Sequence, residues 1–328
     1  MKNNNGIDLI KFIMAIIIVG AHTHALEHCT VPLLIEINRI LVDCSVPYFF
    51  LASGFLLAGK MASTDAPEVH LSILKRQTLK LIRFYLIWSL VYFPLALHSY
   101  IGSGRSFLSC AVSYIKWFFL VGEHYNSWML WYLLSSIYAL LFVQVLYKCH
   151  LKISTITFLG FIVLLISFGF DWVASTDAVL SAPLTELRML LEKTILNGRL
   201  LRGAFYLPAG MLLKEKIHSI LPGIALLIPG AIGSYLFHNT LGAISTAICS
   251  IGIFCISAYL PLKDSGSYRI LRSMSSTVYF IHLYIWTIYY MCVYHQKSYG
   301  MDSFLFTTAL SCAIAFGVYK FRTAKAKD

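Results

Sequence analysis

Three ionisable side chains interrupt the first long apolar run of the chain. Asp8, Lys11 and His22 lie within D-L-I-K-F-I-M-A-I-I-I-V-G-A-H, which otherwise has the composition of a membrane-spanning helix. A charged side chain at the centre of a bilayer costs at least about 2.5–3.5 kcal/mol, so such residues usually face the interior of a bundle and serve a function. On a helix the three side chains lie near one face, with Lys11 and His22 roughly 16 Å apart. An imidazole in such a position can act as a general base.

The same run admits plainer interpretations. Asp8 and Lys11 can lie at the membrane interface and extend their charged ends toward water, which requires no function. His22, His24 and His28 form H-x-H-x-x-x-H, a spacing that can bind a metal ion. No H-E-x-x-H or similar ligand set accompanies this spacing, so we predict no metal.

A second cluster is V-P-Y-F-F-L-A-S-G-F-L-L, residues 46–57. Pro47 is expected to kink or start a helix, and Ser53-Gly54 allows another backbone to approach closely. From these residues alone, a bend required by packing is the stronger interpretation.

A third cluster, K-R-Q-T-L-K-L-I-R-F-Y at residues 75–85, precedes an apolar run. Arg76, Lys80 and Arg83 are four and three residues apart, which places them together on a helix surface. Three cations at the mouth of a bundle suit phosphate groups. Ordinary anchoring by positive charges on the cytoplasmic side explains them equally well.

A fourth cluster is S-S-T-V-Y-F-I-H-L-Y-I-W, residues 275–286. His282 lies about two turns into this apolar, aromatic helix. A lone buried histidine is often structural, so His282 carries little weight by itself.

The elements that position these residues are membrane-spanning helices. The chain of 328 residues is 58% hydrophobic and 12% charged, whereas soluble domains carry about 25% charged residues. We expect one all-α, polytopic membrane domain over residues 1–328, without a soluble domain. The first run lacks an A-x-A-like cleavage site and is expected to be retained. The eight cysteines are scattered without a C-x-x-C pair, which favours apolar filling over metal or disulfide roles.

The net charge of +11 is better explained by positive charges in cytoplasmic loops than by binding of nucleic acid, because no basic block alternates with aromatic residues in a soluble segment.

The distribution of basic residues also predicts the orientation in the membrane. With both termini in the cytoplasm, most lysines and arginines fall on that side. Segment 107–121 is expected to be interfacial or re-entrant, because counting it as an eleventh span would put the basic C-terminal tail outside. Segment 173–199 is expected to be the longest outer connection, and either covers an acceptor site or simply connects two spans. The ten predicted spans are 7–25, 34–59, 79–99, 128–147, 153–172, 200–214, 218–237, 240–260, 275–295 and 302–320.

Taken together, these clusters resemble the acyltransferase 3 family, integral membrane enzymes that acylate, most often acetylate, carbohydrates and other surface molecules. The similarity follows nearly the whole chain in order: D-x-x-[basic]…H, V-P-x-F-F-x-x-S-G-F-L, the basic residues before the third span, and Y-x-I-H. W-M-L-W-Y-L at 128–133 resembles the family's L-W-Y-L segment. F-Y-L-P-A-G-M-L-L at 205–213 resembles its F-x-x-G-x-L-L segment. The block at 46–57 is the most specific part.

The resemblance implies catalytic roles for His22, which matches the family's essential histidine, and for Ser53 in the S-G-F motif. Ser53 with its neighbouring amides, or Arg202, is expected to stabilise the oxyanion. Arg199 is an alternative match for the arginine at Arg202. His282 is expected to orient an acceptor or to belong to the packed centre.

For the donor, the resemblance implies an acyl-CoA on the cytoplasmic side. Lys80 and Arg83 match an R-x-x-R motif with lysine in the first position, and Lys11 stands where an arginine is usual. Together with Arg76 they are expected to bind the CoA phosphates, although lysine lacks the bidentate fork of arginine. Asp8 is expected to pair with Lys11 or to maintain polar order in this part of the helix.

The predicted function is therefore a multi-pass O-acyltransferase of the bacterial cytoplasmic membrane. It uses acetyl-CoA, with succinyl-CoA as the alternative donor, and acylates a hydroxyl of a cell-surface carbohydrate or lipid-linked glycan. We expect His22 to remove the proton of the acceptor hydroxyl, with an acetyl-histidine intermediate as the lesser alternative. Membrane lipid is an expected partner, and nucleic acid is not.

Three other functions fit some of the same features. A transporter or flippase of an envelope precursor also has many spans and buried ionisable groups, but it is usually built from repeated halves, which we do not detect. A non-enzymatic membrane scaffold would tolerate the loss of His22. A relay could pass the acyl group to a separate partner outside the membrane.

Overall fold

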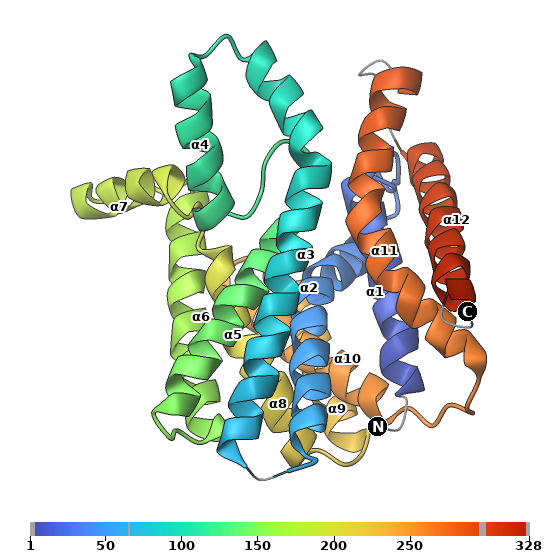
Figure 1. Ribbon diagram of the computed structural model, residues 1–328. Helices are drawn as coiled ribbons and strands as arrows, with labels where there is room; N and C mark the ends of the chain where they lie inside the picture. The colour runs from blue at the N-terminus through green and yellow to red at the C-terminus, as the bar shows by residue number, and fades with distance from the viewer. Residues whose placement is uncertain (1–3, 65, 295–299, 326–328) are drawn as a thin grey trace. The chain divides into compact units, whose positions relative to one another are not determined.

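The computed structural model describes residues 4–64, 66–294 and 300–325, and every regular element in these ranges is helical (Figure 1). The prediction of an all-α fold is therefore confirmed. The helices are α1 (Asn5–His22), α2 (Pro32–Met61), α3 (Pro67–Gly102), α4 (Phe107–Leu120), α5 (Leu130–Lys148), α6 (Ile153–Ser175), α7 (Ala182–Lys193), η1 (Arg199–Arg202), α8 (Gly203–Lys216), α9 (Leu221–Leu236), α10 (Thr240–Tyr259), α11 (Gly266–Tyr289), η2 (Tyr290–Tyr294) and α12 (Met301–Lys325).

Seven helices in the described part of the chain are long and apolar enough to cross a membrane: α1, α2, α3, α5, α6, α10 and α12. Each coincides with one of the ten predicted spans. The spans predicted at 200–214, 218–237 and 275–295 fall on α8, α9 and α11, although residue 295 lies outside the described residues. Helices α8 and α9 have only 14 and 16 residues, and α11 begins with the polar sequence G-S-Y-R-I-L-R. The chain is a membrane protein, whereas ten spans with cytoplasmic termini stay a prediction.

Two connections contain helices of their own. Segment 107–121 forms α4, whose 14 residues extend about 21 Å, less than the roughly 30 Å of a bilayer core. The predicted outer segment 173–199 contains the end of α6, the short helix α7 and the first residue of η1. The length of α4 agrees with a helix that does not span the membrane.

The described residues divide into two compact units. Unit 1 comprises Phe50–His218 and Phe237–Ile244, and unit 2 comprises the remaining described residues. Helices α2 and α10 therefore contribute to both units. Pro47 lies inside the continuous helix α2 and does not start a helix.

In unit 1, α5 packs against α3 and α8, and α8 also packs against α6. Two glycines let α2 and α8 approach closely. A Cβ atom on Gly54 would overlap the carbonyl oxygen of Leu207, and one on Gly210 would overlap that of Leu51. This confirms the prediction that Gly54 allows close backbone approach. The core next to this crossing is apolar and includes Leu57, Met61, Leu74, Leu140, Val143, Ile156, Leu207 and Met211.

In unit 2, α11 lies beside both α1 and α12, as Figure 1 shows. Buried polar contacts join helices distant in sequence: Tyr48 donates to Ser257 over 2.8 Å, and Ser303 donates to the carbonyl of Thr23 over 2.8 Å. Because buried polar groups are costly when unpaired, these bonds favour one packing arrangement of the helices.

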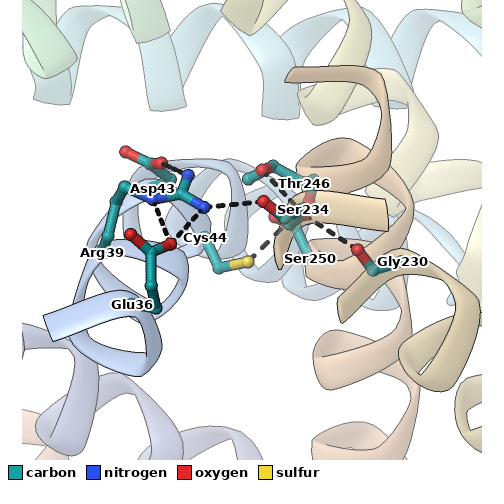
Figure 2. Close-up of polar contacts among 8 residues, drawn as sticks. All are labelled: Glu36, Arg39, Asp43, Cys44, Gly230, Ser234, Thr246 and Ser250. Carbon is teal, nitrogen blue, oxygen red and sulfur yellow. Dashed lines mark hydrogen bonds and ion pairs between the residues drawn. The ribbon is translucent and has the colours of Figure 1, made fainter. Parts of the chain in front are cut away.

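A second polar cluster in unit 2 surrounds Arg39 of α2 (Figure 2). The guanidinium pairs with Glu36 at 2.8 Å and Asp43 at 3.5 Å, and donates to the carbonyl oxygen of Ser234 at 2.6 Å. Its charge is compensated within α2, and the carbonyl contact fixes the end of α9. We interpret this cluster as a structural connection.

Candidate functional site

The predicted catalytic histidine, His22, meets His282 in unit 2. The two imidazole rings are stacked, with their centroids 5.4 Å apart and an interplanar angle of 24°. His22 is the last residue of α1 and is half-buried, whereas His282 is fully buried in α11. The structure therefore brings together two residues that the sequence analysis treated separately, and only His22 has a surface available to a substrate.

The backbone fixes the tautomer of His282. Its Nδ1 lies 3.2 Å from the carbonyl oxygen of Val278, and because a carbonyl only accepts, Nδ1 carries the proton. Nε2 of His282 is then a lone-pair acceptor. It is buried and has no hydrogen-bond partner among the residues that the structure describes. A neutral, oriented ring thus stands behind His22.

Asp8 is 3% exposed and pairs with Arg272 of α11. Nε and Nη2 of Arg272 both donate to the carboxylate, at 2.9 and 2.7 Å, which is the bidentate geometry of the stronger ion pairs. The sequence analysis considered Lys11 as the partner of Asp8 and did not single out Arg272. The Asp8 and His22 contacts bind α1 to α11 at two levels, with half-buried Lys11 between them.

In unit 1, each residue of the S-G-F motif contacts a different neighbour. Ser53 shares a 3.2 Å hydrogen bond with the hydroxyl of Tyr132. Gly54 meets the backbone of α8, and the ring of Phe55 lies 4.7 Å from Nζ of Lys214. The S-G-F motif at residues 53–55 therefore meets segments 128–133 and 205–213 in unit 1, where Ser53 is positioned.

The predicted phosphate-binding residues Arg76, Lys80 and Arg83 are exposed on α3. Lys60, at the end of α2, lies close enough to Lys80 for the two positive charges to repel each other. No carboxylate in the described ranges lies within ion-pair distance of these four cations. We call Lys60, Arg76, Lys80 and Arg83 the cation face. Sequence reasoning missed Lys60 because it resembles any lysine that flanks a span.

Arg202 and its alternative Arg199 are both paired in unit 1. Arg202 pairs with Asp171 at 2.9 Å, and Arg199 pairs with Glu123 of the loop before α5. Burial raises the pKa of Glu123, while the charge of Arg199 acts in the opposite direction. Because both guanidinium groups already hold carboxylates, the role of Arg202 at an oxyanion stays a prediction.

Three comparisons with known proteins complete the description of the site. The family model named Acyl_transf_3, described as an acyltransferase domain, matches residues 4–320. An amino-acid racemase of Enterococcus faecalis is 28% identical over 176 residues, which cover 53% of this chain and 24% of that protein. This chain thus aligns with about a quarter of that relative, whose name does not identify the activity of the aligned part. No solved structure matches the chain.

Proposed function

The chain belongs to the acyltransferase 3 family, and from this premise we propose that it transfers an acyl group, acetyl in the first place, from acyl-CoA to a hydroxyl of a cell-surface carbohydrate or lipid-linked glycan. The observation that carries the proposal is the pairing of half-buried His22 with the buried, neutral ring of His282. A general base needs an accessible nitrogen with a lone pair and a fixed orientation. His22 is half-buried at the end of α1, where a substrate can reach it, and its stacking on His282 restrains the orientation of its ring.

In the proposed reaction, His22 accepts the proton of the acceptor hydroxyl as the oxygen attacks the thioester carbon. The carbon–sulfur bond then breaks, and the thiolate of CoA leaves with the proton that His22 has taken up. The products are the acyl ester and free CoA, so atoms and charge balance. General base catalysis of this kind contributes about 10²–10⁴-fold to a rate.

His282 acts as a positioning residue in this scheme. Its Nδ1 donates to the carbonyl of Val278, which restrains the orientation of the ring that stacks on His22. The Asp8–Arg272 pair holds α1 against α11 near the start of α1, about four turns from His22, and so restrains the helix that carries His22.

The donor is proposed to bind on unit 1. CoA carries several phosphate charges, and the cation face provides positive charges that no carboxylate among the described residues neutralises. The exposed ammonium groups of Lys60 and Lys80 repel each other, and a bound phosphate would relieve this repulsion. Lys214, next to Phe55 of the S-G-F motif, is a further candidate.

The test is His22→Gln in purified, detergent-solubilised protein. We expect a loss of at least 100-fold in the release of CoA from acetyl-CoA in the presence of acceptor, because the general base is removed. The matched control is His24→Asn, two residues away at an exposed position with a φ of 53° that asparagine tolerates. If His22→Gln retains activity while both variants keep the same melting temperature, the proposed role of His22 is wrong. Movement of a substrate without release of CoA would instead support a transporter.

A further inference from the structure

A second group of ionisable side chains lies in unit 1 and is not used by the reaction described above. Arg199 and Arg202 stand at the two ends of η1, a 3₁₀-helix, in which residues three apart lie on the same side. Each guanidinium holds one carboxylate, Glu123 and Asp171 respectively. Each also lies over one aromatic ring: Arg199 is 5.0 Å from the centroid of Trp131, and Arg202 is 5.6 Å from that of Phe168.

His124 adjoins this group through its neighbour Glu123. Its ring stacks on Tyr114 of α4, with centroids 4.0 Å apart and an interplanar angle of 5°. The loop is fixed by Ser127, whose hydroxyl accepts from the amide of His124 at 2.8 Å. The position of the imidazole is therefore set by the backbone and by stacking, since no described residue forms a hydrogen bond to the ring itself.

Both ring nitrogens of His124 are buried and have no hydrogen-bond partner among the described residues, and the same is true of Nε of Arg199. Each buried polar group without a partner destabilises the fold, and these three atoms belong to two residues that are linked through Glu123. A neutral imidazole has one donor and one acceptor, and Nε of an arginine is a donor. Together these atoms match a ligand that both donates and accepts hydrogen bonds.

The charges around His124 narrow the class of ligand. Two arginines face two carboxylates, and burial lowers the pKa of His124 to about 4, so its ring is neutral at pH 7. A charge-balanced group with aromatic surface suits an uncharged polar molecule, whereas an anion would find a better site on the cation face. Hydroxyl groups fit, because each one both donates and accepts.

We infer that His124 and Arg199 bind hydroxyl groups of the acyl acceptor, an uncharged, carbohydrate-like polyol. This inference rests on the proposed function and assigns its acceptor a binding group. Trp131 supplies an apolar ring surface next to the Arg199 guanidinium, as is suitable for the ring of a sugar. Glu123 and Asp171 hold the two arginines in place, and no bond of the acceptor is broken by this group.

The test is His124→Phe, which keeps the stacking on Tyr114 and removes both unpaired nitrogens. The purified parent chain and the variant are given radiolabelled acetyl-CoA and a de-O-acylated envelope carbohydrate extract of the source organism. We expect the apparent KM for the extract to rise about threefold to tenfold, as for one or two lost hydrogen bonds, with the KM for acetyl-CoA unchanged. The melting temperature should stay the same or rise, because buried unpaired polar atoms are removed.

The matched control is His98→Phe, an exposed histidine of α3 in the same unit. An unchanged KM for the extract in His124→Phe overturns the inference. So does a fall in melting temperature with both KM values raised, since that result shows a purely structural residue. If the parent chain transfers no label to the extract, the proposed function itself is wrong and the inference falls with it.

Discussion

Two groups of basic residues in unit 1 differ in whether their charges are paired with carboxylates. Arg199 and Arg202 each hold a carboxylate and lie over an aromatic ring. The cation face of Lys60, Arg76, Lys80 and Arg83 has no ion pair within the described ranges. A charge that is compensated internally contributes to packing, whereas exposed charges that repel each other are available to an anionic ligand. The difference separates arginines whose charge is neutralised within the fold from cations that suit a phosphate-bearing donor.

The largest effect is expected from breaking a compensated pair. Glu123→Gln leaves Arg199, which is 23% exposed, without its carboxylate. Losing a hydrogen bond to a charged group costs about 1.5–3 kcal/mol. We expect the free energy of unfolding to fall by about that amount, measured by thermal or denaturant unfolding in detergent. Glu186→Gln, at an exposed site on α7, is the control. A stability equal to that of the parent would mean that Arg199 finds another partner, and the contrast between the two groups would weaken.

A smaller effect, of a different kind, is expected on the cation face. Lys80→Gln combined with Arg83→Gln should raise the apparent KM for acetyl-CoA about tenfold, because two charges that face no carboxylate are removed. The melting temperature should not change, since exposed cations contribute little to stability. Lys75→Gln, on the same helix and also exposed, controls for the loss of net charge. An unchanged KM would show that these residues act only as topological anchors.

The same comparison shows how far sequence reasoning reached. The apolar runs predicted the helices well where they were long, as in α2 and α6, because length and hydropathy are local properties. They were less informative for α11, where a polar start and an apolar end share one helix. The prediction that Gly54 permits close approach is confirmed, but only the fold identifies Leu207 of α8 as the neighbour.

Individual residues of the site could be predicted from the sequence, but the contacts between them could not. His22 and His282 were both recognised, yet their stacking depends on α1 packing against α11, which no short pattern encodes. Arg272 was not singled out, because its partner, Asp8, is 264 residues away in the sequence. His124 was not singled out at all. Its distinguishing property is that its buried ring nitrogens are unpaired, and burial of a single atom is invisible before the chain is folded.

The smallest effect is a pH dependence that separates His124 from the charged groups near it. Burial lowers the pKa of His124 to about 4 from its ordinary value of 6.5, so the unfolded chain binds a proton more readily than the folded one. Stability is therefore complete above pH 6.5 and falls as the pH drops toward 4, by about 1 kcal/mol between pH 7.5 and 5.5. Glu123, whose pKa burial raises, acts in the opposite direction, since its contribution is lost as the pH rises.

Comparing the parent chain with His124→Phe isolates the histidine, because Glu123, Arg199 and Tyr114 are common to both. We expect the unfolding free energy of the parent to decline relative to the variant as the pH falls from 7.5 to 5.5, measured by denaturant unfolding at each pH. The variant lacks the titrating ring, so the difference between the two proteins should widen toward acid. Parallel pH profiles would mean that the His124 ring is already hydrated in the folded state. Its nitrogens would then form hydrogen bonds with water. The group around His124 would no longer differ from the cation face in being closed to solvent.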